Sequence, residues 1–173
     1  MPSITAAVAR SAKGAFTLET LQLDNPRSDE ILIRIEGVGL CHTDLIARDG
    51  MMPFALPAVL GHEGSGVVEA VGVEVRKVKP GDAVALTFRS CGSCARCLCG
   101  EPAYCHTMPA LNYSGARIDG STALRSGAER IVSNFFGQSS FGTHALAYER
   151  NVVKLPPDVP IELMGPLGCG VQT

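Results

Sequence analysis

The sequence predicts a mainly β fold, a small β-barrel or sandwich, and two observations support this prediction. Short runs of alternating or β-branched residues recur along the chain, and turn-forming stretches such as 24–26 and 79–82 separate them. The chain also holds 19 glycines and 11 prolines, which supply the positive or preset φ angles that tight turns and bulges need. With 173 residues, 46% of them hydrophobic, the chain is expected to form one domain with a buried core.

Six strands are expected, with only short helical turns between them. The runs that predict the strands are 4–8, 16–23, 31–38, 66–75, 83–88 and 144–148. Helical periodicity is weak, and the two helical turns that we expect lie around 41–48 and 161–164. The stretch 106–134 is polar, dotted with glycine and irregular, so we expect a surface excursion that either borders a cleft or is a loop with no role.

Charge and hydropathy exclude several classes of partner. Lys and Arg number 15 against 17 Asp and Glu, for a formal net charge of -2, and no run of like charges could neutralise a phosphate backbone. The first ten residues lack a cationic start before a long apolar stretch, and no segment reaches the roughly 18 apolar residues of a membrane span. We therefore expect a cytoplasmic protein with no nucleic-acid or membrane partner.

The cysteines indicate metal binding. They occupy positions 41, 91, 94, 97, 99, 105 and 169, an odd number, and four of them crowd into the nine residues 91–99. Disulfides are rare in a reducing cytosol, and an odd count would leave one thiol unpaired. Crowding of this kind favours a metal site over a disulfide framework.

Cys91, Cys94 and Cys97 form two successive C-x-x-C steps, and Cys105 follows after seven residues. Four thiolates at about 2.3 Å saturate a tetrahedral zinc ion and leave no open position, so this lobe is expected to stabilise structure and to do no chemistry. An iron-sulfur cluster is the main alternative, because ferredoxins use the same spacing with a remote fourth cysteine. Redox-active or unligated thiols are a further alternative. Cys99 lies too close to Cys97 for a clean ligand and is interpreted as a spare thiol.

Cys41, His62 and Cys169 stand apart in the sequence, each with a glycine within two residues. Two cysteines and one histidine leave the fourth position of a zinc ion open for water or substrate, which is the ligand set of a catalytic site. Taken singly, a cysteine beside glycine is usually a packed small side chain, and a lone histidine is usually a satisfied polar group. Spacing by itself does not join the three residues.

Five motifs follow one another along the chain. They are C-H-T-D at 41–44, L-P-A-V-L-G-H-E-G-S-G-V-V at 56–68, K-P-G-D-A-V at 79–84, the four-cysteine lobe at 91–105 and G-C-G at 168–170. In these motifs the chain resembles the zinc-containing medium-chain alcohol dehydrogenases over nearly its whole length. The first two motifs are most similar to the aryl-alcohol (benzyl-alcohol) dehydrogenase branch. The resemblance implies a GroES-like, partly open β-barrel over residues 1–173, with a zinc-binding lobe and few short helices.

The resemblance also implies two zinc ions. Cys41, His62 and Cys169 would hold the catalytic zinc, and the four lobe cysteines would hold the structural one. Asp44 would orient His62 through its other ring nitrogen, and Glu63 would lie close behind the catalytic metal.

Roles for the substrate and the cofactor follow in the same way. Thr43 would accept the proton of the substrate hydroxyl, and His42 and Thr173 match positions near the cofactor pyrophosphate and the nicotinamide. Ile46 replaces a histidine that ends the proton relay in many members, so the proton would leave by water or a cofactor hydroxyl. The candidate pocket walls are Thr43, Phe54, Phe88 and the loop after Cys105. Ordinary core packing is the alternative for both phenylalanines.

The implied activity is NAD-dependent oxidation of aryl (benzyl-type) primary alcohols to aldehydes, in which zinc favours the alkoxide and hydride passes to the nicotinamide. No G-x-G-x-x-G follows a predicted strand, so we expect the Rossmann cofactor domain to be absent, the chain to be a fragment that is inactive alone, and the full enzyme to be a homo-oligomer. The alternatives are a short-chain aliphatic alcohol dehydrogenase, a glutathione-dependent formaldehyde dehydrogenase, a non-catalytic GroES-like zinc module, or an electron-transfer protein.

Overall fold

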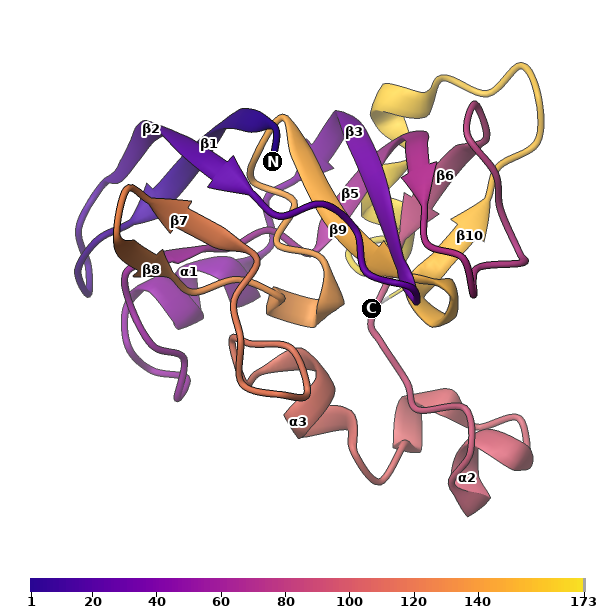
Figure 1. The fold of residues 1–173 in the computed structure, drawn as a ribbon. Coiled ribbons are helices and arrows are strands. Elements are labelled where there is room, and N and C mark those ends of the chain that lie inside the picture. Colours follow the sequence, from indigo (N-terminus) through magenta and orange to yellow (C-terminus); the bar gives the residue numbers. More distant parts are fainter. Residues whose placement is uncertain (173) are drawn as a thin grey trace.

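Two sheets of five strands each form the body of the protein in a computed structural model, which describes residues 1–172 (Figure 1). The first sheet has the order β4-β1-β2-β7-β8, and its strands, in that order, are Ala58–Val59, Ser3–Ala9, Phe16–Leu23, Leu124–Ser126 and Glu129–Ile131. The second sheet has the order β10-β6-β5-β3-β9, and its strands are Val152–Lys154, Ala83–Leu86, Glu63–Val71, Glu30–Gly39 and His144–Tyr148. Neighbouring strands pair antiparallel in both sheets, and the mainly β prediction is confirmed.

Helices are few and short in the described chain. Within residues 1–172 the α-helices are α1 (His42–Arg48), α2 (Ala95–Leu98) and α3 (Met108–Asn112). The 3-10 turns are η1 (Pro102–Tyr104), η2 (Phe135–Gly137), η3 (Glu149–Asn151), η4 (Ile161–Leu163) and η5 (Gly165–Gly168). The helical turns predicted at 41–48 and 161–164 correspond to α1 and η4. None of these helices has the length and apolar character needed to cross a membrane.

Strand β3 separates two hydrophobic cores. Leu32 packs into the first core with residues such as Ile4 and Leu21, whereas Ile31 and Ile33 pack into the second core on the other face of the strand. Successive side chains of a strand point to opposite faces, so a strand that is buried on both faces needs an unbroken apolar run. Burial contributes about 1.5–3 kcal/mol for each such side chain. The two cores thus fix the strands that carry the candidate site.

The predicted strands are all present, and those at 16–23 and 144–148 have the predicted ends. The largest difference is at β5, which was expected at 66–75 and runs over Glu63–Val71. Glycines are typical of turns, but the glycines at the start of β5 allow its backbone to pack closely against β3. A Cβ at Gly66 would collide with the carbonyl oxygen of Arg34 on that strand.

The prediction of an irregular excursion at 106–134 is wrong for much of this stretch. It contains α3 and the hairpin of β7 and β8, which completes the first sheet, and Leu124 and Ile131 lie in the first core. Strands of three residues are too short to show alternation, and this explains why the pattern gave no signal. Figure 1 shows that the part from α2 to α3 projects from the two sheets as a lobe.

Candidate metal centres

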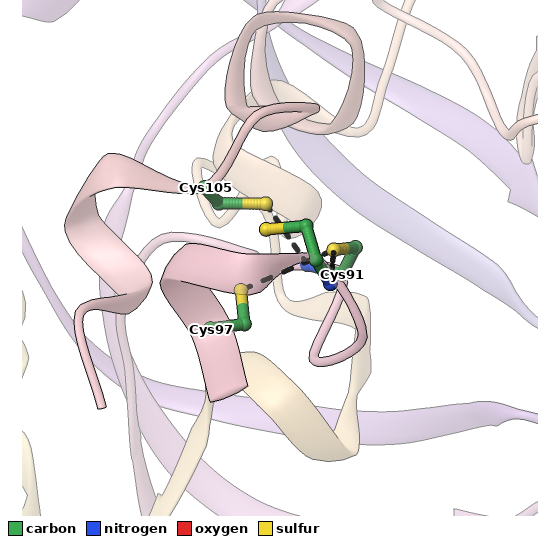
Figure 2. Close-up of side chains that lie close together, drawn as sticks. Cys91, Cys97 and Cys105 are labelled. Atoms are coloured by element: carbon green, nitrogen blue, oxygen red, sulfur yellow. Dashed lines mark hydrogen bonds between the residues drawn. The ribbon is translucent and has the colours of Figure 1, made fainter. Parts of the chain in front are cut away.

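The four cysteines of the lobe converge on one point. The Sγ atoms of Cys91, Cys94, Cys97 and Cys105 all lie within 4.8 Å of one another, and those of Cys91 and Cys97 are 3.9 Å apart. Figure 2 shows the sulfurs gathered beside the short helix that carries Cys97. Zinc–sulfur bonds of about 2.3 Å place the ligands of a tetrahedron about 3.8 Å apart. The donor set and its spacing therefore fit a zinc ion.

The local backbone arranges these thiols. Gly92, at φ 76°, turns the chain between the first two ligands. The N–H of Cys94 donates to Cys91 Sγ at 3.3 Å, and the N–H of Cys91 donates to Cys105 Sγ at 3.3 Å. Backbone N–H groups of Ser93 and Cys94 lower the pKa of Cys91 to about 5, which favours the thiolate that a metal requires. Cys99 is exposed and lies outside the cluster, as expected for a spare thiol.

A buried amide joins the two ends of the lobe to each other. Asn112 Oδ1 accepts from the Arg89 N–H at 2.8 Å, and Asn112 Nδ2 donates to the carbonyl oxygens of Arg89 at 2.8 Å and Met108 at 2.7 Å. Arg89 precedes the first ligand, and α3 follows the last one. The lobe is thereby closed at its base.

The second cluster brings together residues that are up to 128 positions apart in the sequence. One ligand atom from each of Cys41, His62, Glu63 and Cys169 lies within 4.8 Å of the others, and the two cysteine sulfurs are 4.0 Å apart. Cys41 precedes α1, His62 precedes β5, and Cys169 follows η5. Only the packing of α1, β5 and η5 joins them.

Asp44 links two of these segments. Its side chain is fully buried and accepts three hydrogen bonds of 3.0 Å, from the backbone N–H groups of Cys41 and Gly61 and from His62 Nδ1. Burial opposes protonation of His62 and is the largest single influence, but the hydrogen bond to Asp44 and the charges of Asp44 and Cys41 together outweigh it and raise the pKa of the imidazole. This contact assigns the Nδ1 proton toward Asp44 in the neutral tautomer, so that Nε2 is left with a free lone pair.

His62 Nε2 provides a test of whether a metal ion fits. It is buried and has no hydrogen-bond partner among residues 1–172. An unpaired buried polar atom costs about 1–3 kcal/mol, and here it lies in the same cluster as the Cys41 and Cys169 thiols. A zinc ion held by these three residues would satisfy the nitrogen and use the preferred ligand types.

Glu63 is the fourth residue of this cluster and lies beside the three expected ligands. Its Oε1 accepts from the Gly170 N–H at 2.8 Å, and a Cβ at Gly39 would collide with the other carboxylate oxygen. Burial, with the neighbouring Cys41 as a second cause, raises the pKa of the Cys169 thiol to about 12. A positive ion would offset this burial and the repulsion between the thiolates.

The remaining predicted residues lie around this centre. The Thr43 hydroxyl is 3.6 Å from Cys41 Sγ, and His42 is exposed at the start of α1. Ile46 is half-buried on α1 and offers no polar atom. Thr173 lies outside the described residues.

A cavity of about 250 Å³ opens beside the second cluster. Its lining residues are His62, Phe88, Met108, Phe136, Gly168, Cys169 and Gln172. Phe88 lines it, as predicted, and so does Met108, which begins α3 in the stretch after Cys105, whereas Thr43, another predicted wall, is not among the lining residues. Phe54 does not line the cavity: it is buried in a third hydrophobic core, apart from the two that β3 separates, against Phe135 with ring centroids 4.9 Å apart, so the core-packing alternative is correct for this residue.

Phe136 is a site residue that the sequence did not reveal. Its ring stacks on His62 with centroids 4.5 Å apart and an interplanar angle of 23°. Its backbone is left-handed, at φ 52°, which is unusual for a bulky side chain and turns the ring toward the cluster. Tyr113 packs edge-on against the same ring, with centroids 5.2 Å apart. No local pattern distinguishes Phe136 from an ordinary core phenylalanine.

Comparison with known proteins gives the same picture. Residues 27–157 match the model of the alcohol dehydrogenase GroES-like domain. The geraniol dehydrogenase of Castellaniella defragrans is 56% identical over 99% of this chain and 46% of its own length. An alcohol dehydrogenase zinc-binding domain protein from Burkholderia ambifaria superposes with a TM-score of 0.97 and 54% identity, over 99% of this chain and 47% of that one.

A benzyl alcohol dehydrogenase from Acinetobacter calcoaceticus superposes with a TM-score of 0.95 and 48% identity, over 100% of this chain and 46% of that one. The chain thus spans about half the length of the curated relatives it matches. The match to the family model covers most of the chain. The chain therefore belongs to the zinc-type alcohol dehydrogenase family, and its fold is the GroES-like domain of that family.

Proposed function

We propose that this chain is the catalytic domain of an NAD-dependent alcohol dehydrogenase that oxidises aryl, benzyl-type primary alcohols to aldehydes. The observation that carries the proposal is the open ligand set of Cys41, His62 and Cys169, which faces a cavity walled by Phe88 and Phe136. Three protein ligands leave one position for substrate, and aromatic walls suit a flat, unsaturated group. When bound, zinc would supply Lewis acidity to an alcohol hydroxyl, and the nicotinamide would accept hydride.

The side chains around this cluster would orient its ligands and move the proton. Asp44 holds the His62 ring so that Nε2 faces the thiols. Thr43 carries a hydroxyl 3.6 Å from Cys41 Sγ and would take the substrate proton. Because Ile46 has no polar atom, the proton would pass from Thr43 to water or to a cofactor hydroxyl. His42, exposed at the start of α1, would contact the cofactor pyrophosphate.

Allylic alcohols are a second candidate substrate class, favoured by the similarity to geraniol dehydrogenase. Geraniol and benzyl alcohol share a carbinol carbon bonded to an unsaturated carbon, so both give conjugated aldehydes. A pocket that recognises this feature would accept either alcohol.

We also propose that residues 1–173 act together with a Rossmann cofactor domain in a homo-oligomeric enzyme. The curated relatives are about twice as long as this chain, and the sequence contains no G-x-G-x-x-G after a strand. The four-cysteine lobe would then hold the structural zinc. The 173 residues alone are expected to bind zinc and to show no turnover.

The test compares alcohols that differ in unsaturation and little in shape. An enzyme containing this domain should oxidise benzyl alcohol with a kcat/KM at least about tenfold above that of cyclohexylmethanol, which corresponds to about 1.4 kcal/mol of transition-state discrimination. Geraniol and citronellol form the second pair, and a preference for geraniol over benzyl alcohol would favour the allylic class. A clear preference for ethanol would overturn both assignments.

A further inference from the structure

The three ligand-bearing segments of the second cluster are tied together by different side chains. Asp44 connects the backbone before Cys41 to His62, as described above. The segment of Cys169 has no contact with Asp44 among the hydrogen bonds of residues 1–172. Glu63 reaches one side of it through the Gly170 N–H. The other side is held by Thr87, whose hydroxyl donates to the Gly168 carbonyl oxygen at 3.0 Å.

Gln138 extends this contact to His62. Its side chain is 2% exposed, and Nε2 donates to the carbonyl oxygens of His62 at 2.8 Å and Thr87 at 3.2 Å. Its Oε1 accepts from the Gly64 N–H at 3.1 Å. A continuous path therefore runs from His62 through Gln138 to Thr87 and on to Gly168, the residue before Cys169.

The backbone around Gln138 is itself fixed. The segment 134–141 lies against 59–64, where the Ser140 N–H donates to the Gly61 carbonyl oxygen at 2.9 Å and the Ser139 hydroxyl donates to that of Val59 at 2.7 Å. Several residues of this segment adopt positive φ, namely Asn134, Phe136, Gly137 and Ser139. A Cβ at Gly64 would lie 2.7 Å from Ser140 Cβ, so the two segments pack without space for a side chain. Gln138 is thus held in one place behind His62.

We propose that Gln138 and Thr87 are positioning residues that set the placement of Cys169 relative to His62. The inference rests on the catalytic zinc site of the proposed function. Neither side chain is a ligand, and neither lines the cavity. Their hydrogen bonds join the segment of His62 to the segment of Cys169, and Asp44 does not join these two segments to each other. Loss of such supporting contacts typically weakens metal binding about 10- to 100-fold.

Zinc release from the purified, zinc-loaded protein tests this role. The variants are Gln138→Met, which removes all three side-chain hydrogen bonds at similar size, and Thr87→Val, which replaces the hydroxyl with a methyl group. Competition with a chromogenic chelator should show that one of the two zinc ions of Gln138→Met is bound about 10- to 100-fold more weakly than in wild type. Thr87→Val should weaken the binding of the same ion by a smaller factor. Thr87→Ser keeps the hydroxyl and should bind that ion with wild-type affinity.

Asn112→Leu is the matched control, because Asn112 is another buried amide with three hydrogen bonds, placed at the base of the four-cysteine lobe. It should weaken the lobe zinc and leave the other ion at wild-type affinity. The variants at Gln138 and Thr87 should do the reverse.

The outcomes separate this inference from the proposed function. Wild type that binds no zinc at Cys41, His62 and Cys169 would overturn the proposed function. If wild type binds two zinc ions, and Thr87→Val and Gln138→Met release both ions as wild type does, only the positioning role is overturned. Equal weakening of both ions in these variants would also overturn it, since a general loss of stability would then be the cause. If Gln138→Met fails to fold, the comparison of Thr87→Val with Thr87→Ser decides the matter.

Discussion

Asp44 determines the orientation and the tautomer of the His62 ring. It is fully buried, and its two carboxylate oxygens accept from three N–H donors, which compensates the cost of burying a charge. An amide at this position would turn an NH2 group toward at least one of those donors. The His62 ring would then lose its orientation or its hydrogen bond.

We therefore expect Asp44→Asn to weaken zinc binding at His62 about 10- to 100-fold and to destabilise the fold by about 1–3 kcal/mol. Metal analysis after dialysis against a weak chelator, with urea unfolding, would measure both effects. Asp119→Asn, at a side chain 55% exposed, is the control and should keep two zinc ions. Retention of both ions by Asp44→Asn would contradict the assigned contact.

At the scale of elements, the four-cysteine lobe depends on its metal. Its buried apolar cluster comprises little beyond Cys97, Cys105 and Leu111, so the lobe has almost no hydrophobic core of its own. Zinc binding to such a segment is folding free energy. Cys94→Ser should lose one zinc ion per chain and lower the midpoint of thermal unfolding. Cys99→Ser, at the exposed thiol beside it, should keep both ions and the wild-type midpoint, and loss of zinc there would show that the ligand set is wrong.

Arg117 anchors the connection between α3 and β7. Its guanidinium donates to both oxygens of Glu30, at 2.6 and 2.9 Å, and to Asp24 at 2.8 Å. Glu30 is 1% exposed and also accepts from the Tyr148 hydroxyl at 3.2 Å. The ion pair of Arg117 with Glu30 therefore attaches the segment after the lobe to strand β3.

Removing one partner of a buried pair leaves an unpaired charge, so Arg117→Met should destabilise the fold by about 3–5 kcal/mol. The double variant Glu30→Gln with Arg117→Met should recover much of that loss, because no charge remains buried. Arg125→Met removes an exposed ion pair with Asp24 and should cost no more than about 1 kcal/mol. Urea unfolding measures all three. A loss for Arg117→Met no larger than that for Arg125→Met would refute the anchoring role.

At the scale of the whole molecule, the two cores and the two metal clusters are largely separate. Among residues 1–172, the two cores that β3 separates contain no cysteine or histidine of either metal cluster. Removal of zinc by a strong chelator should leave the amides of β1, β3 and β5 protected from hydrogen exchange. Amides of the lobe, from Cys91 through α3, should exchange faster by at least about tenfold, because local unfolding follows local stability. Equal loss of protection in β3 would show that the sheets also need the metal.

The local features could be predicted from the sequence because their causes are local. The strand at 16–23 follows from alternation, and the ligands Cys91, Cys94 and Cys97 follow from short spacing that lets the chain turn back on one ion. The hairpin of β7 and β8 could not be predicted, since three-residue strands show no period and are stabilised by pairing with β2. Phe136 and Gln138 were missed for a related reason: the contacts that matter, with His62 and Thr87, join residues at least 51 positions apart.

The sequence by itself determined the fold class, the four-cysteine lobe and, through the order of its motifs, the family. It named Cys41, His62 and Cys169 only by resemblance, because no local period relates residues so far apart. Tertiary structure alone brought their ligand atoms within 4.8 Å and left His62 Nε2 buried without a partner. It also separated Phe88, which lines the cavity, from Phe54, which packs in the core. Contacts between distant segments depend on how whole sheets pack, and local sequence does not encode that packing.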